Sequence, residues 1–113
     1  MKIDIFTKNI IFEDFINKKI EFDGIFAISD RMAAGALNVL TANSYSVPED
    51  VEIIGFDNTD ISYTSNPSIT TVSQPHTLLG SNAVKQLMNI INNNSVDNVL
   101  LQHKIVKRNS TKN

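Results

Sequence analysis

The chain contains 113 residues, of which 42% are hydrophobic and 19% are charged, and it has no cysteine. This composition is typical of one folded domain and excludes a disordered tail, and the missing thiols exclude disulfides, thiolate metal sites and cysteine nucleophiles. A formal net charge of -2 argues against a surface that lies along a phosphate backbone, and no apolar run approaches the ~20 residues that cross a bilayer.

The first part of the chain predicts a strand, a helix and a second strand. Residues 2–6 alternate enough for a short strand. Apolar side chains recur at helical spacing in residues 9–19, and residues 22–28 are almost all apolar, as in a strand covered on both faces. Because Asp4 interrupts the first stretch and no small-residue cleavage site follows it, we expect no signal peptide and a cytoplasmic location.

A helix and a third strand follow. Small and apolar residues at helical spacing mark the helix over residues 32–40, which ends at Asn43. Residues 51–56 form the strand, and Gly55 permits a sharp turn at its carboxyl end. A strand, helix, strand crossover makes a parallel pair of strands, so their carboxyl ends lie at one edge of the sheet.

The second half predicts a loop, a short crossing strand, a long helix and a final strand. Residues 58–68 are polar, and β-branched side chains fill residues 69–72 shortly before Pro75. An apolar stripe runs along residues 76–93 and indicates a helix. Side chains alternate along residues 99–106, as in a strand, after which the tail is polar.

Polar side chains gather at the edge where the two buried strands end. Ser29 and Asp30 follow the first of these strands, and Asp57 and Asn58 follow the other. Ligands of open parallel sheets bind outside the carboxyl ends of the strands, so these side chains predict a site for a small polar molecule. The pattern indicates binding rather than catalysis.

Each of these side chains has a structural alternative. The Asp57 carboxylate can hold adjacent hydroxyls of a sugar, or it can be a turn residue at the strand end. Asp30 precedes the helix of residues 32–40, and we favour a role as its N-cap over a ligand contact. Ser29 offers one donor, and Asn58 is open between a turn residue and a residue that supports the site.

Catalysis and metal binding find little support in the sequence. His76 and His103 lie in separate predicted elements, so we expect no metal site and no cofactor. The turn at residues 29–31 lacks the glycines that let a backbone approach a pyrophosphate. Asp30 and Asp57 remain open as a carboxylate pair, but no serine, histidine and acid set has sequence support, and we expect no enzyme.

Several short motifs give the chain a family resemblance. In chain order they are Asp23-Gly24-Ile25-Phe26-Ala27, Met32-Ala33, Val47-Pro48-Glu49-Asp50-Val51, Ile54-Gly55-Phe56-Asp57-Asn58, Thr70-Thr71-Val72-Ser73-Gln74-Pro75 and Arg108-Asn109-Ser110-Thr111. In this order and spacing the chain, from Phe22 onward, resembles the C-terminal part of bacterial transcription regulators of the lactose-repressor and galactose-repressor family.

The resemblance implies an α/β fold, namely an incomplete lobe of periplasmic-binding-protein type in which helices cover a parallel sheet in three layers. Residues 1–68 are then strands and helices of the C-terminal lobe, and residues 69–75 are a hinge crossing. Residues 76–94 are a helix that belongs to the missing N-terminal lobe, and residues 95–113 are a returning strand and tail. We expect the helix-turn-helix headpiece of this family to be missing as well.

The resemblance also implies residues for an effector and for a dimer. It places an effector-contacting aspartate at Asp57, whereas Ser29 departs from the asparagine that is more usual there, which leaves the effector open. The corresponding helix and loop of relatives contribute to a dimer interface, the alternative being a helix packed tightly on its own sheet. The predicted interface residues are Ala33, Ala34, Asn38, Ile61 and Tyr63.

The implied function is effector sensing by a cytoplasmic transcriptional regulator that binds a sugar or another small polar metabolite. DNA is contacted only through the missing headpiece, and no membrane contact is expected. Because the helix of residues 76–94 lacks its lobe, we expect a homodimer or an exchange of elements between two copies. Two alternatives stay open: the C-terminal part of a sugar-binding receptor that serves a transporter, and a remnant that only dimerises.

Overall fold

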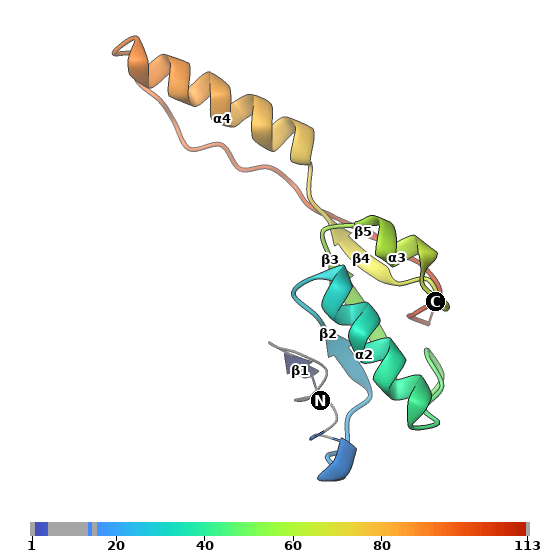
Figure 1. Cartoon of the computed structure of the whole chain (residues 1–113). Helices are drawn as coiled ribbons and strands as arrows, with labels where there is room; N and C mark the ends of the chain where they lie inside the picture. Colours follow the sequence, from blue (N-terminus) through green and yellow to red (C-terminus); the bar gives the residue numbers. More distant parts are fainter. Residues whose placement is uncertain (1, 5–13, 15, 113) are drawn as a thin grey trace. The chain divides into compact units, whose positions relative to one another are not determined.

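The computed structural model describes residues 2–4, 14 and 16–112 and has an α/β fold built on one sheet (Figure 1). The five strands lie in the order β1-β2-β3-β4-β5, and β1 to β4 are parallel neighbours. The strands are β1 (Lys2–Asp4), β2 (Gly24–Phe26), β3 (Glu52–Phe56), β4 (Thr70–Ser73) and β5 (Lys104–Val106). The helices are α2 (Asp30–Ala42), α3 (Asp60–Thr64) and α4 (His76–Ile91).

The chain divides into two compact units, which are described separately. Unit 1 comprises residues 1–73 and 105–113 and contains β1 to β4, all of β5 except Lys104, α2 and α3. Unit 2 comprises residues 74–104 and contains α4 with the segment that follows it. The chain therefore passes from unit 1 into unit 2 after β4 and returns at β5.

The core of unit 1 lies between α2 and the sheet. In β3, Ile53 and Gly55 are buried on the face that α2 covers, and Ile54 and Phe56 are half-buried on the other face. The alanines of α2 let the helix backbone approach the strands closely, so the core fills with short side chains and a few large ones. The core residues are Ile25, Ala27, Ala33, Ala34, Ala36, Leu37, Val39, Leu40, Val51, Ile53 and Ile69.

In unit 2, none of the α4 side chains is buried. The side-chain amide of Gln86 donates to the main-chain oxygen of Asp97 at 2.7 Å. This bond links α4 to the segment that follows it in the chain. Large apolar side chains of α4 are half or more exposed: Leu78, Leu79, Val84, Leu87, Met88, Ile90 and Ile91. Among the helices that the structure describes, none is long and apolar enough to cross a membrane.

The predicted elements are confirmed for β1, β2, α2, β3, β4 and α4, with ends that differ by a few residues. Two predictions were wrong. The loop expected over residues 58–68 contains the short helix α3, and the strand expected over residues 99–106 is limited to Lys104–Val106. Of the helix predicted over residues 9–19, residues 9–13 and 15 lie outside the described residues, and residues 14, 16 and 17 are helical.

Replacing Gly55 with alanine is expected to destabilise unit 1 by about 1–3 kcal/mol, because the core has no room for a methyl group there. A Cβ at Gly55 would collide with the carboxylate of Asp30 and lie 3.2 Å from the Asp30 Cα. Urea denaturation at one protein concentration, followed by circular dichroism, measures the loss.

Gly24→Ala in β2 is the matched control, since its Cβ would meet only the Glu52 main-chain oxygen at 3.9 Å. Equal losses in the two variants would contradict the packing described for Gly55.

Candidate functional site

The candidate site lies where the carboxyl ends of β2 and β3 meet. These strands are parallel neighbours, and Phe26 of one pairs with Ile54 of the other. Ser29 and Asp30 follow β2, and Asp57 and Asn58 follow β3. The predicted side chains therefore lie at one edge of the sheet, as expected for a crossover of this kind.

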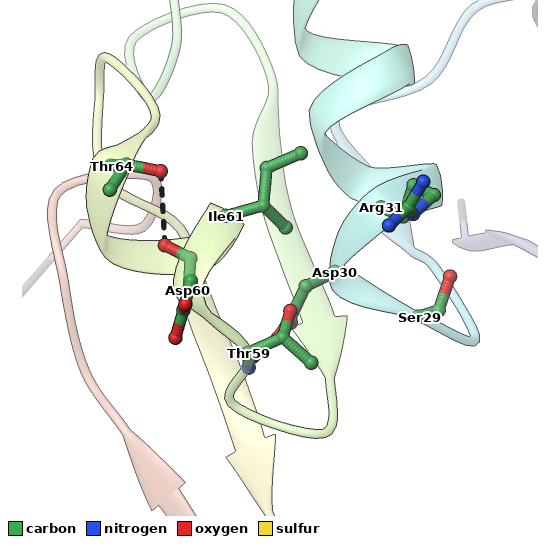
Figure 2. A pocket seen from close by; sticks show the side chains of 7 residues that line it. All are labelled: Ser29, Asp30, Arg31, Thr59, Asp60, Ile61 and Thr64. Carbon is green, nitrogen blue, oxygen red and sulfur yellow. Dashed lines mark hydrogen bonds between the residues drawn. The ribbon is translucent and has the colours of Figure 1, made fainter.

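An open hollow of about 750 Å³ lies at this edge between the start of α2 and α3 (Figure 2). Ser29 and Asp30 are two of the predicted residues that line it, whereas Asp57 and Asn58 are not among its lining residues. The other lining residues are Arg31, Thr59, Asp60, Ile61 and Thr64. Hydroxyls, one guanidinium and two carboxylates surround the hollow, a polar set that suits hydrogen bonding to a small molecule.

Ser29, and not Asp30, is the N-cap of α2. Its backbone is extended, with φ of -153°, and its Oγ accepts a hydrogen bond from the Met32 main-chain N–H at 3.2 Å. The N-cap role predicted for Asp30 was therefore wrong. Ser29 satisfies one of the free N–H groups of the first turn, which limits the lone pairs that it can offer to a ligand.

Asp30 is fully buried in the first turn of α2. Its Oδ2 accepts from the main-chain N–H of Thr59 at 2.6 Å and from the Thr59 hydroxyl at 3.0 Å. Its Oδ1 accepts from the hydroxyl of Thr71 in β4 at 2.5 Å. These bonds and the positive end of the α2 dipole compensate the burial of a carboxylate, and they join α2, β4 and the loop after β3. A contact of Asp30 with an effector stays a prediction.

Asp57 and Asn58 form a left-handed turn, with φ of 94° and 54°. This conformation costs most residues roughly 1–2 kcal/mol, although aspartate and asparagine tolerate it better. The Asp57 N–H donates to the Val72 main-chain oxygen at 2.9 Å, and the Asn58 N–H donates to the Thr71 hydroxyl at 3.2 Å. Asp57 is half-buried at the sheet edge, and its role as an effector ligand stays a prediction.

Arg108 supports this turn from the segment after β5. Its Nη2 donates to the Asn58 Oδ1 at 2.6 Å. Its Nη1 donates to the Ser62 hydroxyl at 3.0 Å and to the Ile69 main-chain oxygen at 2.9 Å. The Asn58 side chain is thus engaged within the protein, which favours its supporting role over a direct ligand contact.

Ser110 fastens the C-terminal segment to the sheet. It is fully buried, and its hydroxyl accepts from the Thr70 N–H at 2.8 Å and donates to the Ile53 main-chain oxygen at 2.6 Å. Sequence reasoning missed the roles of Thr59, Thr71, Arg108 and Ser110. The motif of residues 108–111 was the available signal, but it did not reveal which partners these side chains have.

The predicted dimer-interface residues divide into two groups. Ala33 and Ala34 are buried in the core of unit 1, which favours the alternative that α2 packs tightly on its own sheet. Ile61 is half-buried against the same core. Asn38 and Tyr63 are exposed and remain candidates for a partner contact.

No group of three or more histidine, aspartate or glutamate side chains in the described part of the chain could hold a metal ion. His76 begins α4, and His103 lies in the segment that follows this helix. The arrangement at the sheet edge offers hydrogen-bond donors and acceptors.

Residues 8–111 match the periplasmic binding protein-like domain. Among relatives, the chain is 40% identical over 98 residues to the HTH-type transcriptional regulator RegA of Clostridium saccharobutylicum, covering 85% of this chain and 29% of RegA. Its structure is similar to that of the transcriptional regulator CelR in complex with cellobiose, with a TM-score of 0.82 and 30% identity over 90% of this chain and 32% of CelR.

A lac repressor dimer bound to operator and the anti-inducer ONPF is also similar, with a TM-score of 0.84 and 30% identity over 89% of this chain and 36% of the repressor chain. The chain thus spans about a third of the length of the relatives that it matches. The resemblance read from the motifs of the sequence is confirmed.

Asp60→Asn is expected to lower the pKa of Tyr63 toward its ordinary value. The Tyr63 hydroxyl donates to the Asp60 carboxylate at 3.0 Å, and this bond, with the negative charge of Asp60, raises the pKa of Tyr63. A raised pKa stabilises the fold below the pKa of the unfolded chain, and this contribution is lost as the pH rises through the folded value. NMR titration of the Tyr63 ring measures the change.

Glu49→Gln, which removes an exposed carboxylate elsewhere in unit 1, serves as the control and should leave the Tyr63 titration unchanged. A Tyr63 titration that is the same in the Asp60 variant and in the parent chain would refute the assigned cause.

Proposed function

The chain belongs to the periplasmic binding protein-like domain family, and we propose that it is the effector-sensing part of a bacterial transcriptional regulator of the lactose-repressor and galactose-repressor type. The observation that carries this proposal is the polar edge of the parallel sheet, where Asp57 lies in a left-handed turn after β3 and Ser29 follows the neighbouring strand β2. Binding at this edge is the usual use of an open parallel sheet. The match to RegA supports the regulatory role.

The proposed effector is a sugar or a similar small polar metabolite. An ionised carboxylate such as that of Asp57 accepts two hydrogen bonds and so can hold adjacent hydroxyls. Structures similar to this chain include CelR with cellobiose and a periplasmic binding protein/LacI transcriptional regulator of Alkaliphilus metalliredigens with D-xylulofuranose, which supports a carbohydrate. The chemistry is binding without catalysis, as in regulators.

A receptor that feeds a transporter is the alternative from another class. The relatives named above include the transcriptional regulators RegA and CelR, which favours the regulator over the receptor. We place the protein in the cytoplasm, where such a regulator meets DNA. Contact with DNA would be made by a headpiece that these residues do not include.

We assign α4 to the lobe that the rest of such a regulator supplies. Residues 69–75 are then a hinge crossing, and residues 95–113 return to the lobe of residues 1–68. The exposed apolar side chains of α4 support this assignment, because a helix with no buried side chain needs a covering surface. In such a regulator, two lobes would close around the effector. Because the effector would bind one arrangement of the dimer more tightly than the other, it would shift the dimer toward that arrangement.

Because α4 is uncovered, the chain by itself is expected to self-associate as a homodimer or by exchange of elements. Leu87→Glu with Ile90→Glu is expected to weaken this association, since both side chains are 56% exposed and each contributes roughly 1.5–3 kcal/mol when fully buried. Sedimentation velocity at several concentrations measures the mass.

Lys85→Glu, on the exposed surface of the same helix, changes the net charge by the same two units as the double variant and is the matched control. A parent chain that sediments as a monomer at all concentrations would refute the expectation.

The effector proposal is tested in a chimaera in which this chain replaces the 98 residues of RegA that it matches. We expect a panel of sugars and sugar phosphates to contain a compound that changes repression of a reporter gene. Asp57→Asn should raise the concentration needed for half response by tenfold or more, because the amide loses the charge that strengthens its hydrogen bonds.

Glu49→Gln, at an exposed carboxylate away from the sheet edge, is the control for loss of a negative charge and should respond like the parent chimaera. Repression that no sugar alters, in a chimaera that still represses, would argue for the remnant that only dimerises.

A further inference from the structure

We propose that Thr71 and Arg108 are positioning residues that hold Asp57 in place for the effector and couple it to the two segments joining the units of the chain. The inference rests on the proposed function, in which Asp57 contacts the effector. It concerns residues that make no ligand contact themselves and that act through Asn58.

The turn of Asp57 and Asn58 needs anchors, because two successive left-handed residues persist only where the surrounding structure over-determines them. The Asp57 N–H is bonded to Val72 of β4. The next two anchors act on Asn58, one on its main chain and one on its side chain. A shift of Asn58 therefore changes the direction in which the carboxylate of Asp57 is presented.

The first anchor is the hydroxyl of Thr71, which donates one hydrogen bond and accepts another. Its single proton is donated to Asp30 Oδ1 at 2.5 Å, because a carboxylate only accepts. Its lone pair is thereby aimed at the Asn58 N–H, which lies at 3.2 Å. Thr71 is fully buried, so its hydroxyl is shielded from water.

The second anchor is the guanidinium of Arg108. Two bonds from Nη1, to Ser62 and to the main-chain oxygen of Ile69, fix the plane of the group. Nη2 then meets the Asn58 Oδ1 at 2.6 Å. A lysine cannot reproduce this fork of donors, although it keeps the charge.

The positions of these anchors in the chain give them a second consequence. Thr71 lies in β4, three residues before Gln74, where the chain enters unit 2. Arg108 lies three residues after Ile105, where the chain has returned to unit 1. The turn that carries Asp57 is therefore bonded to both of the segments that join the two units, so a displacement of either segment acts on the effector contact.

Four variants test the proposal in the chimaera described above: Thr71→Val, Thr71→Ser, Arg108→Lys and, as a control on an exposed hydroxyl of α2, Thr41→Val. The readouts are repression without sugar and the sugar concentration for half response. In the 113-residue chain, hydrogen exchange of the Asn58 amide reports whether the turn has loosened.

We expect Thr71→Val and Arg108→Lys to raise the half-response concentration by tenfold or more. Arg108→Lys leaves the bonds of Asp30 intact, so its repression without sugar should stay near the parent level. Exchange of the Asn58 amide should accelerate by at least tenfold in Thr71→Val. Thr71→Ser keeps the hydroxyl and should restore both readouts, and Thr41→Val should change neither. In Arg108→Lys, a loss of repression and of response together would indicate a merely structural role and overturn the proposal.

The outcomes separate this inference from the proposed function. A parent chimaera without any sugar response counts against the effector role, and the exchange measurement then decides whether the anchors hold the turn. A parent that responds, with variants that respond at the same concentration, overturns the positioning role alone. If Thr71→Val fails to fold, Arg108→Lys decides, because it leaves the buried hydrogen bond between Asp30 and Thr71 intact.

Discussion

The buried carboxylate of Asp30 is the interaction on which the rest of unit 1 depends. A carboxylate taken out of water is costly unless hydrogen bonds compensate it, and Asp30 receives three, from Thr59 and Thr71. These donors come from the loop after β3 and from β4, so satisfying one side chain fixes three elements together. The same carboxylate occupies the space beside Gly55, which is why a side chain is excluded at that position of β3.

Hydrogen bonds of this kind determine the conformation of the turns at the sheet edge, which apolar packing alone does not determine. The apolar core, with Ile53 and Leu40 at its centre, holds α2 against the strands but gives no direction to a turn. The hydroxyls of Thr71 and Ser110 are bonded on both their donor and acceptor sides and so have one arrangement each. Arg108 adds a third fixed group. The turn of Asp57 and Asn58 is consequently defined by hydrogen bonds from outside itself.

The sequence predicts the long elements of this fold because their signals are local. The periodic stripes of α2 and α4 and the buried run of β3 need no knowledge of their neighbours. α3 was missed because its five residues, Asp60–Thr64, are too few to show a period. The alternation over residues 99–106 gave a strand that is too long, since alternation alone does not supply a neighbouring strand for residues 99–103.

The candidate site was only partly predictable for a related reason. Its edge follows from the crossover rule, which correctly brings the ends of β2 and β3 together. Whether Ser29 or Asp30 caps α2 depends on the residue at which the helix begins, and sequence patterns do not resolve one position. The bonds from Thr71 to Asp30 and from Arg108 to Asn58 join residues 41 and 50 positions apart. Such pairs follow from the fold and have no local signature.

The two units of the chain differ in what stabilises them, and this difference has a functional meaning. Unit 1 buries an apolar core of its own, whereas α4 in unit 2 buries none of its side chains. A helix of 16 residues is marginal in water when nothing packs on it. Under the proposed function, the rest of the regulator supplies a surface that covers α4, since this chain spans about a third of its relatives. The polar edge thus belongs to the unit that has an apolar core, and the unit of the exposed helix is joined to it by the chain segments that follow Thr71 and precede Arg108.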